Sequence, residues 1–326
     1  MSILFIGPYR NTDTLGQVSR LYISQLAKRY GTEDVVSRPV YLSSLHRILP
    51  KKIEFITEKT SIAQNQYDIC VQHLPLEHIQ YMPDVASQHH VFPIIENIED
   101  FGISSSSLDI LRFFDNIVVQ SKKEASTITT YCPDLADKIS ILDTGVDKNN
   151  LINYTNNKYV FDNYHHTKKL YFIGNFDEDE GIIKKIIFSL YSSISERPFG
   201  AVCVFFLDYY NAPNIELLEN NIKNMRSEFG LPTEYGKEIF IFKQFTESEI
   251  IAAHKSCDIY LSLNEKNTLY LQETYARLCG NTVISLDDYS DIAVPMKTEL
   301  ASYSYQMKRR SISTINLSKL IKSAII

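Results

Sequence analysis

Short apolar runs alternate with amphipathic segments along most of this chain. The apolar run at residues 3–6 has the length and the flanking turn residues of a buried strand. In the next segment, apolar residues recur at the spacing of one helix face, at Val18, Leu21, Tyr22 and Leu26. Strands that alternate with helices in this way predict a parallel sheet joined by right-handed crossovers.

The same pattern predicts the elements of the rest of the chain. We expect strands at residues 2–6, 35–41, 67–72, 91–95, 116–120, 139–142, 169–173, 201–207, 239–242, 259–263 and 283–285. We expect helices at residues 18–29, 105–114, 122–131, 182–194, 215–229, 246–256, in the segment after Glu265, and at 315–326. Thr246 and Glu249 have the spacing of a capping box at the start of the helix at 246–256. Residues 43–66 are polar and have no clear period.

Length and linker composition indicate two α/β domains. The chain has 326 residues, which is enough for two domains of about 150 residues each. Residues 148–167 are rich in Asn and Tyr and lack a period, as a linker does. We therefore expect a first Rossmann-like domain at 1–150, a linker at 151–167, a second Rossmann-like domain at 168–310, and a C-terminal helix at 311–326.

Two carboxylates stand out in the second half. Glu265 follows the apolar run at 259–263, and Glu273 lies in the first turns of the next expected helix, which Gly280 ends. In an open α/β sheet, ligands bind at the carboxyl ends of the strands. Carboxylates there repel phosphate but accept hydrogen bonds from sugar or ribose hydroxyls.

This arrangement resembles the donor site of the retaining GT4-type glycosyltransferases, which have the GT-B fold. The shared features are the two glutamates with seven residues between them, the Cys-Gly that ends the helix, and the apolar strand that follows. The segments FDNIVVQS and ISILDTGVD also resemble the end of the first domain in that family. The segment YDICVQHLP resembles phage-encoded members. The resemblance covers residues 2–290 and implies two Rossmann-like, doubly wound domains facing each other across a cleft. In the family the terminal helix crosses back onto the first domain, and the resemblance implies that the helix at 311–326 could do so.

The resemblance also assigns roles to individual residues. It implies that Glu273 binds the nucleotide ribose, that Glu265 lies near the donor sugar, and that His73 contacts the sugar or the acceptor. Backbone amides for the diphosphate or sugar would come from Asn267, Thr268 and Leu269, and Gly174 and Asn175, after the first strand of the second domain, would also bind the donor. The cleft side of the first domain would be lined by Arg10, Asn11, Gly16 and Glu96.

One segment departs from the family. The family places an Arg and a Lys after the first strand of the second domain, whereas this chain has Gly174 and Asn175 followed by the acidic run 177–180. A leaving diphosphate gains negative charge, so cations or donor amides are needed there. Three explanations stay open: Lys184, Lys185 or Lys243 supplies the charge, a divalent metal on the acidic run bridges to the phosphates, or catalysis is lost.

The implied function is a retaining hexosyl- or pentosyltransferase that moves a sugar from a nucleotide-sugar, a UDP- or GDP-sugar, to an acceptor hydroxyl. No cofactor is required. A glycan or lipid carrier is one acceptor class, and a hydroxymethylated base in phage DNA is an alternative. A non-catalytic GT-B-like binding protein is a third reading. The net charge of −6 argues mildly against a surface for non-specific nucleic-acid binding.

The remaining observations concern the compartment. The opening apolar run is expected to be a strand and not a signal peptide, and no run approaches the roughly 20 apolar residues of a membrane span. We expect a cytoplasmic protein. The five cysteines are Cys70, Cys132, Cys203, Cys257 and Cys279, and none forms a C-x-x-C pair. Cys70, Cys203 and Cys257 lie in or beside apolar runs, so we expect these three to be buried, reduced thiols.

Overall fold

The computed structural model describes most of the chain, which divides into two compact units. The described residues are 1–11, 14–42, 56–58, 67–94, 108–142, 146, 151, 159–164, 167–194, 201–209, 214–228, 230–231, 238–263, 271–285, 293–295, 310–312 and 314–325. The first unit is made mainly of Met1–Val146, and the second mainly of Asp147–Asn267, Gln272–Glu299 and Lys308–Ile326. Each unit is described separately below.

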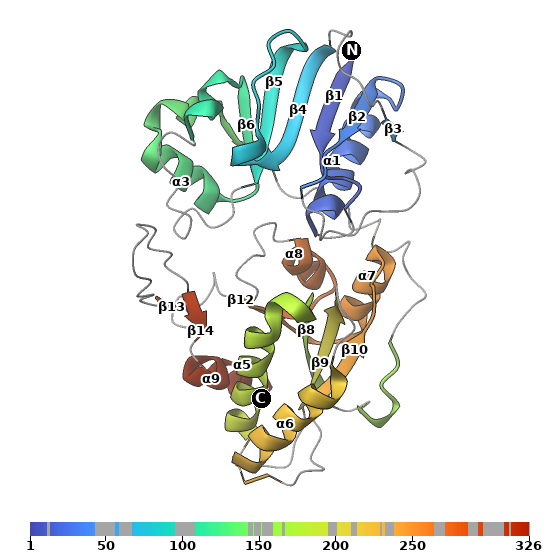
Figure 1. Ribbon diagram of the computed structural model, residues 1–326, viewed down its shortest axis with the longest axis vertical. Helices are drawn as coiled ribbons and strands as arrows, with labels where there is room; N and C mark the ends of the chain where they lie inside the picture. The colour runs from blue at the N-terminus through green and yellow to red at the C-terminus, as the bar shows by residue number, and fades with distance from the viewer. Residues whose placement is uncertain are drawn as a thin grey trace. The chain divides into compact units, whose positions relative to one another are not determined.

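The first unit is a seven-stranded parallel sheet with the order β3-β2-β1-β4-β5-β6-β7 (Figure 1). Its strands are β1 (Ile3–Gly7), β2 (Val35–Pro39), β3 (Thr57–Glu58), β4 (Tyr67–Pro75), β5 (Ala86–Ile94), β6 (Asn116–Val119) and β7 (Ile139–Ile141). Its α-helices are α1 (Thr14–Tyr30) and α3 (Lys122–Tyr131), and its short 3-10 helices are η1 (Leu76–His78), η2 (Ile110–Phe113) and η3 (Pro133–Lys138). The predicted parallel sheet is present.

Successive residues of the central strand β4 point to opposite faces of this sheet. Cys70 and Leu74 pack into the cluster that also contains Ile128 of α3. His73 points to the opposite face, where its ring contacts Tyr22 of α1 edge-on. The sheet is therefore covered on both sides, as a parallel sheet requires.

The second unit has a five-stranded parallel sheet with the order β10-β9-β8-β11-β12. Its strands are β8 (Lys168–Asn175), β9 (Ala201–Asp208), β10 (Glu238–Phe242), β11 (Ile259–Ser262) and β12 (Thr282–Ser285). Its helices are α5 (Phe176–Ile194), α6 (Ile215–Glu228), α7 (Glu247–Ser256), α8 (Leu271–Leu278) and α9 (Thr314–Ile325), and η4 (Asp162–Tyr164) and the hairpin β13 (Ala293–Pro295)–β14 (Arg310–Ile312) complete the described elements.

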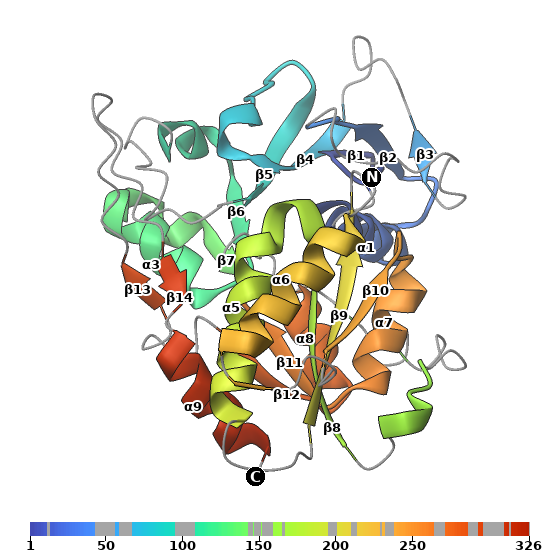
Figure 2. The same ribbon diagram turned by 60° about the horizontal axis from the view of Figure 1, so that its bottom comes forward.

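Alternating residues of β8 divide the second core in the same way. Leu170 and Phe172 join the cluster formed with α5, α6 and α9, and Figure 2 shows these three helices together in front of the sheet. Tyr171 joins the opposite cluster, which contains Ala253 of α7 and Ala276 of α8. The second unit is therefore also a doubly wound layer structure.

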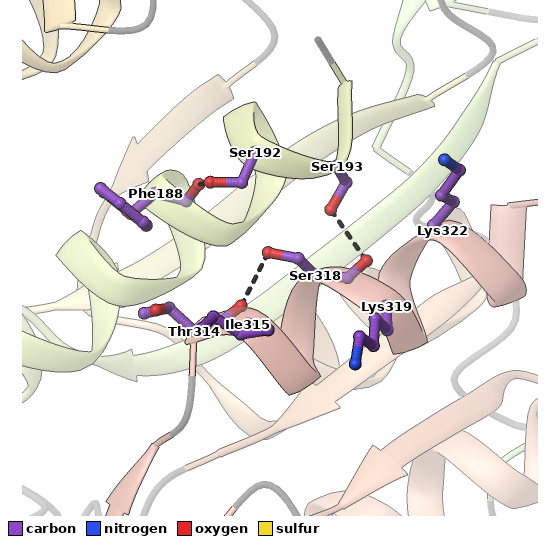
Figure 3. A pocket seen from close by; sticks show the side chains of 8 residues that line it. All are labelled: Phe188, Ser192, Ser193, Thr314, Ile315, Ser318, Lys319 and Lys322. Atoms are coloured by element: carbon purple, nitrogen blue, oxygen red, sulfur yellow. Dashed lines mark hydrogen bonds between the residues drawn. The ribbon is translucent and has the colours of Figure 1, made fainter. Parts of the chain in front are cut away.

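The expected C-terminal helix is present as α9, and it packs closely against α5. Serine residues allow the approach: Ser189 Oγ donates to the Thr314 carbonyl at 3.2 Å, and Ser193 Oγ donates to the Ser318 carbonyl at 2.9 Å. A hollow of about 290 Å³ lies between the two helices, lined in part by Phe188 and Ile315 (Figure 3). The serine hydroxyls that line the hollow donate hydrogen bonds to backbone carbonyls of α5 and α9. These serines therefore have a structural role in joining or bracing the two helices.

Two helix boundaries follow from local chemistry. Thr246 accepts from the Glu249 amide, while the Glu249 side chain accepts from the Thr246 amide, which confirms the expected capping box of α7. At the end of α8, the amide of Asn281 donates to the carbonyl of Ala276 at 3.0 Å, and Gly280 lies between them. This bond is the Schellman closure for which a glycine after a helix is the signal.

Candidate functional site

The carboxyl ends of the parallel strands in the second unit carry the candidate donor site. Glu273 lies in the first turn of α8 and is almost fully buried. Its Oε1 accepts a hydrogen bond of 2.7 Å from Ser285 Oγ at the end of β12, and its Oε2 lies 3.7 Å from Arg277 NH2. Because each carboxylate oxygen can accept more than one hydrogen bond, this arrangement orients Glu273 and leaves it able to accept from a ligand hydroxyl.

The hydroxyl of Tyr260 on β11 interacts electrostatically with two carboxylates near this edge of the sheet, those of Glu273 and Asp179. Burial raises the pKa of the Tyr260 hydroxyl, and the negative charges of Glu273 and Asp179 raise that pKa further, whereas a hydrogen bond with Ser262 lowers it. The phenol therefore stays protonated near neutral pH. Glu273 of α8 and Asp179 of α5 thus belong to one electrostatic neighbourhood.

The turn from β8 to α5 differs from the sequence-based expectation. The acidic run 177–180 was expected in a loop before a helix at 182, but α5 begins at Phe176, so these residues form its first turns. Asp179 is 3% exposed, and its Oδ2 accepts from the Asn175 amide at 2.8 Å. Acidic side chains at a helix start complement the unpaired amides and the helix dipole, which explains why the helix starts early.

The same contact covers Gly174 and Asn175, the two residues of this turn predicted to bind the donor. A Cβ on Gly174 would lie 2.4 Å from Asp179 Oδ2 and 2.4 Å from the ring of Phe172. The glycine is therefore needed for close packing within the chain itself. The Asn175 amide is already engaged by Asp179, so a diphosphate would have to displace this carboxylate to reach that amide.

Two of the three lysines predicted to replace the usual cations, Lys184 and Lys243, have acidic partners. Lys184 Nζ lies 2.6 Å from Glu180 Oε1, one helical turn away. Lys243 Nζ pairs with Glu249 Oε1. Exposed ion pairs of this kind contribute about 1 kcal/mol or less, so an arriving phosphate could compete for either ammonium group. Of the other predicted site residues, Glu96, Glu265, Asn267, Thr268 and Leu269 lie outside the described residues.

In the first unit, Arg10 is held by a partner that the sequence did not reveal. Arg10 Nε donates to Glu58 Oε1 at 2.7 Å and NH2 donates to Oε2 at 2.8 Å, so the pair is bidentate. The Glu58 side chain is only 7% exposed. Glu58 lies in β3, within the polar stretch 43–66 that had no clear period. No local pattern therefore marked Glu58 as the partner of Arg10. The ion pair between Arg10 and Glu58 therefore links the turn after β1 to the edge strand β3.

Asn11 and Gly16 form the tight start of α1. Arg20 NH1 donates to the carbonyls of Tyr9 and Asn11, both at 2.7 Å. A Cβ on Gly16 would lie 2.0 Å from the Asn11 carbonyl oxygen. The helix begins at Thr14 rather than near residue 18, so Gly16 belongs to its first turn. Its missing side chain allows the chain to pack against its own backbone.

His73 is fully buried on the α1 side of β4. Its Nδ1 lies 2.7 Å from Ser19 Oγ, and its Nε2 has no hydrogen-bond partner within the described part of the chain. Burial lowers the pKa of His73 to about 3, so the ring is neutral at physiological pH. Its chemistry is therefore that of a neutral hydrogen-bonding group.

A second buried histidine, His254 of α7, was not singled out from the sequence. Its Nδ1 lies 2.6 Å from the hydroxyl of Tyr171, and its Nε2 lies 3.0 Å from Gln272 Oε1. Burial lowers the pKa of His254 to about 4. No local pattern marks this histidine, because its partners come from β8 and α8.

The two histidines predict that acid destabilises both units. The unfolded chain titrates each histidine near 6.5, whereas the folded units keep the rings neutral down to about 3 for His73 and about 4 for His254. As the pH falls below 6.5, the unfolded state binds more protons, so stability present above 6.5 is lost toward these folded pKa values. We expect each unit to lose roughly 1 kcal/mol per pH unit in urea unfolding between pH 6.5 and 4.5.

Substitutions separate this effect from that of the carboxylates. His73→Gln should flatten the pH dependence of the first unit, and His78→Gln, which changes an exposed histidine, should leave it unchanged. Equal slopes in all three proteins would contradict the assignment.

Within the described segments, no group of three or more His, Cys, Asp or Glu side chains is placed to hold a metal ion. No described helix has the length and apolar character needed to cross a membrane. All five cysteines are free, and four of them are buried.

Comparison with known proteins shows the fold. No protein-family model matches the chain, and no curated protein sequence does. Among solved structures, the E. coli trehalose-6-phosphate structure bound with UDP-2-fluoro glucose matches with a TM-score of 0.62 at 10% identity, over 99% of this chain and 95% of that one. A trehalose-6-phosphate synthase studied with bisubstrate glycomimetics matches with a TM-score of 0.57 at 9% identity, over 100% and 95% of the two chains.

Anabaena HepE in complex with UDP-glucose also has a TM-score of 0.57, at 12% identity over 100% of this chain and 90% of that one. These likenesses confirm the predicted fold class: a mixed α/β protein with parallel sheets and Rossmann-like domains of the GT-B type. Identities this low establish the fold alone.

Proposed function

We propose that this chain is a retaining glycosyltransferase that transfers a sugar from a nucleotide-sugar to an acceptor hydroxyl. The observation that carries the proposal is the placement of Glu273. Its buried carboxylate stands at the carboxyl edge of a parallel sheet, where such folds bind ligands, and Ser285 orients it. A carboxylate there recognises vicinal hydroxyls, as a ribose presents them. The similar structures with bound UDP-2-fluoro glucose and UDP-glucose support the same donor class.

In the proposed mechanism, Glu273 holds the ribose while the bond between sugar and diphosphate breaks. Lys184 and Lys243 exchange Glu180 and Glu249 for the phosphates as negative charge grows on the leaving group. The acceptor hydroxyl attacks the same face of an oxocarbenium-like sugar and passes its proton to an oxygen of the leaving diphosphate. His73 stays a predicted contact of the sugar or acceptor: its ring is neutral at physiological pH, and its Nε2 is buried, so it would have to be uncovered before it could bond a hydroxyl. In this scheme, rate enhancement comes from positioning and electrostatic support.

A panel of nucleotide-sugars tests the proposal. The wild-type protein is titrated with UDP- and GDP-sugars by calorimetry and then incubated with glycan, lipid-linked and hydroxymethylated-DNA acceptors. Products are identified by mass spectrometry, and the anomeric configuration is read by NMR. We expect one donor to bind and to yield a product with retained configuration. If no nucleotide-sugar is bound or hydrolysed, the proposal is wrong. A product on hydroxymethylated DNA alone would select that acceptor class.

The second candidate function is a non-catalytic nucleotide-sugar-binding protein. It is favoured by the β8–α5 turn, where Asp179 engages the Asn175 amide and acidic residues stand in place of cations. Donor binding without turnover against every acceptor would select this function.

A further inference from the structure

A buried hydrogen-bond chain runs beneath the start of α8, and one direction of its donors gives every hydrogen in it an acceptor. Asn281 Nδ2 lies 2.7 Å from the His254 carbonyl oxygen, which can only accept, so the orientation of this amide is determined. The same Nδ2 lies 2.7 Å from the Tyr171 hydroxyl and donates to it. The Tyr171 proton is then directed to His254 Nδ1 at 2.6 Å. His254 must therefore carry its proton on Nε2, which donates to Gln272 Oε1 at 3.0 Å.

This chain ends at the residue next to Glu273. Gln272 and Glu273 share the first turn of α8, a helix of eight residues. Helices this short are marginal alone and depend on tertiary contacts. Other side-chain bonds also hold α8: Tyr275 Oη donates to Glu247 Oε1 at 2.8 Å, and Ser285 Oγ donates to Glu273. Within the described part of the chain, the bond from His254 holds the side chain of Gln272, the residue immediately before the carboxylate.

We propose that His254 is a positioning residue for the donor site, acting through its Nε2–H bond to Gln272 to set the orientation of Glu273. This inference rests on the proposed function. His254 and Gln272 are 0% and 6% exposed, so water does not easily replace either partner. When the bond is lost, the first turn of α8 can rotate, and Glu273 meets the ribose hydroxyls out of alignment.

Two conservative variants of His254 each keep one of its two side-chain hydrogen bonds and remove the other. His254→Gln retains an N–H donor near the Nε2 position and can still reach Gln272. His254→Asn retains an acceptor near the Nδ1 position for Tyr171 but is too short to reach Gln272. If the bond to Gln272 positions Glu273, His254→Asn should weaken UDP binding about tenfold, whereas His254→Gln should stay within about threefold of wild type.

A control elsewhere in the same unit separates positioning from general destabilisation. Tyr191→Phe breaks another largely buried network, in which Tyr191 Oη donates to Glu238 Oε2 at 2.5 Å and accepts from Arg226 Nε at 2.9 Å. We expect this variant to lower the thermal midpoint about as much as His254→Asn while leaving the Kd for UDP unchanged. Calorimetric titration with UDP and thermal unfolding are measured on all four proteins.

The outcomes distinguish the two levels of inference. Wild-type affinity in folded His254→Asn, or equal loss of affinity in Tyr191→Phe, would overturn the positioning role. Failure of the wild-type protein to bind any nucleotide would instead overturn the proposed function. A third arm checks the route: Gln272→Leu should weaken UDP binding as His254→Asn does, and the double variant should be no weaker than either single variant.

Discussion

Replacing Glu273 with alanine is expected to weaken nucleotide-sugar binding about 10- to 100-fold, the range for losing one or two charge-assisted hydrogen bonds of about 1.5–3 kcal/mol. The carboxylate is almost fully buried and is oriented by the hydrogen bond that it accepts from Ser285 Oγ. Isothermal calorimetry with the UDP- or GDP-sugar identified in the donor panel measures the effect.

Two matched variants sharpen this result. Glu273→Gln retains an acceptor for Ser285 but loses the charge, so we expect intermediate affinity. Glu219→Ala removes an exposed glutamate of α6 and should bind like wild type. Wild-type affinity in Glu273→Ala, with its fold intact by circular dichroism, would remove the observation on which the proposed function depends.

Replacing Gly16 with alanine is expected to destabilise the first unit by about 3 kcal/mol, the upper part of the usual range for overpacking. The new Cβ would lie 2.0 Å from the Asn11 carbonyl oxygen and 2.7 Å from its carbon. These are backbone atoms, and Arg20 already holds that carbonyl, so relief requires breaking the start of α1. Urea unfolding monitored by circular dichroism measures the loss.

The same substitution in α5 provides the control. Gly181 is exposed within that helix, and a Cβ there meets nothing within 4 Å. Gly181→Ala should therefore stabilise the second unit by about 1 kcal/mol through helix propensity. If both variants were equally destabilised, the crowding at Gly16 would not be the cause.

Local patterns predicted much of this fold. Helix α3 runs over Lys122–Tyr131, the range expected from the apolar spacing after Ser121. The capping box at Thr246 and Glu249 was visible because both partners lie within one turn of each other. Most strands of both sheets were visible because a buried parallel strand is a continuous apolar run; the exception is β3, Thr57–Glu58, which lies in the polar stretch 43–66. Such features depend only on residues close together in sequence.

The start of α5 was predicted wrongly: the sequence pattern placed it at residue 182, whereas the helix begins at Phe176. Gly174 followed by a polar, acidic run is typical of a loop, and the sequence was interpreted in that way. In the structure Asp179 turns back and accepts from the Asn175 amide, which stabilises the helix from Phe176 onward. The sequence contains the acidic residues but does not show which of them points inward.

By itself, the sequence determined the alternation of strands and helices, and so the fold class, and it placed Glu273 in the helix that follows the apolar run at 259–263. Only the tertiary structure decided the partners: Glu58 for Arg10, Ser285 for Glu273, and Tyr171 and Gln272 for His254. The physical reason is that hydrogen bonds and ion pairs require an approach to within about 3 Å. Pairings between distant segments depend on strand order and register, which the local hydrophobic pattern does not encode.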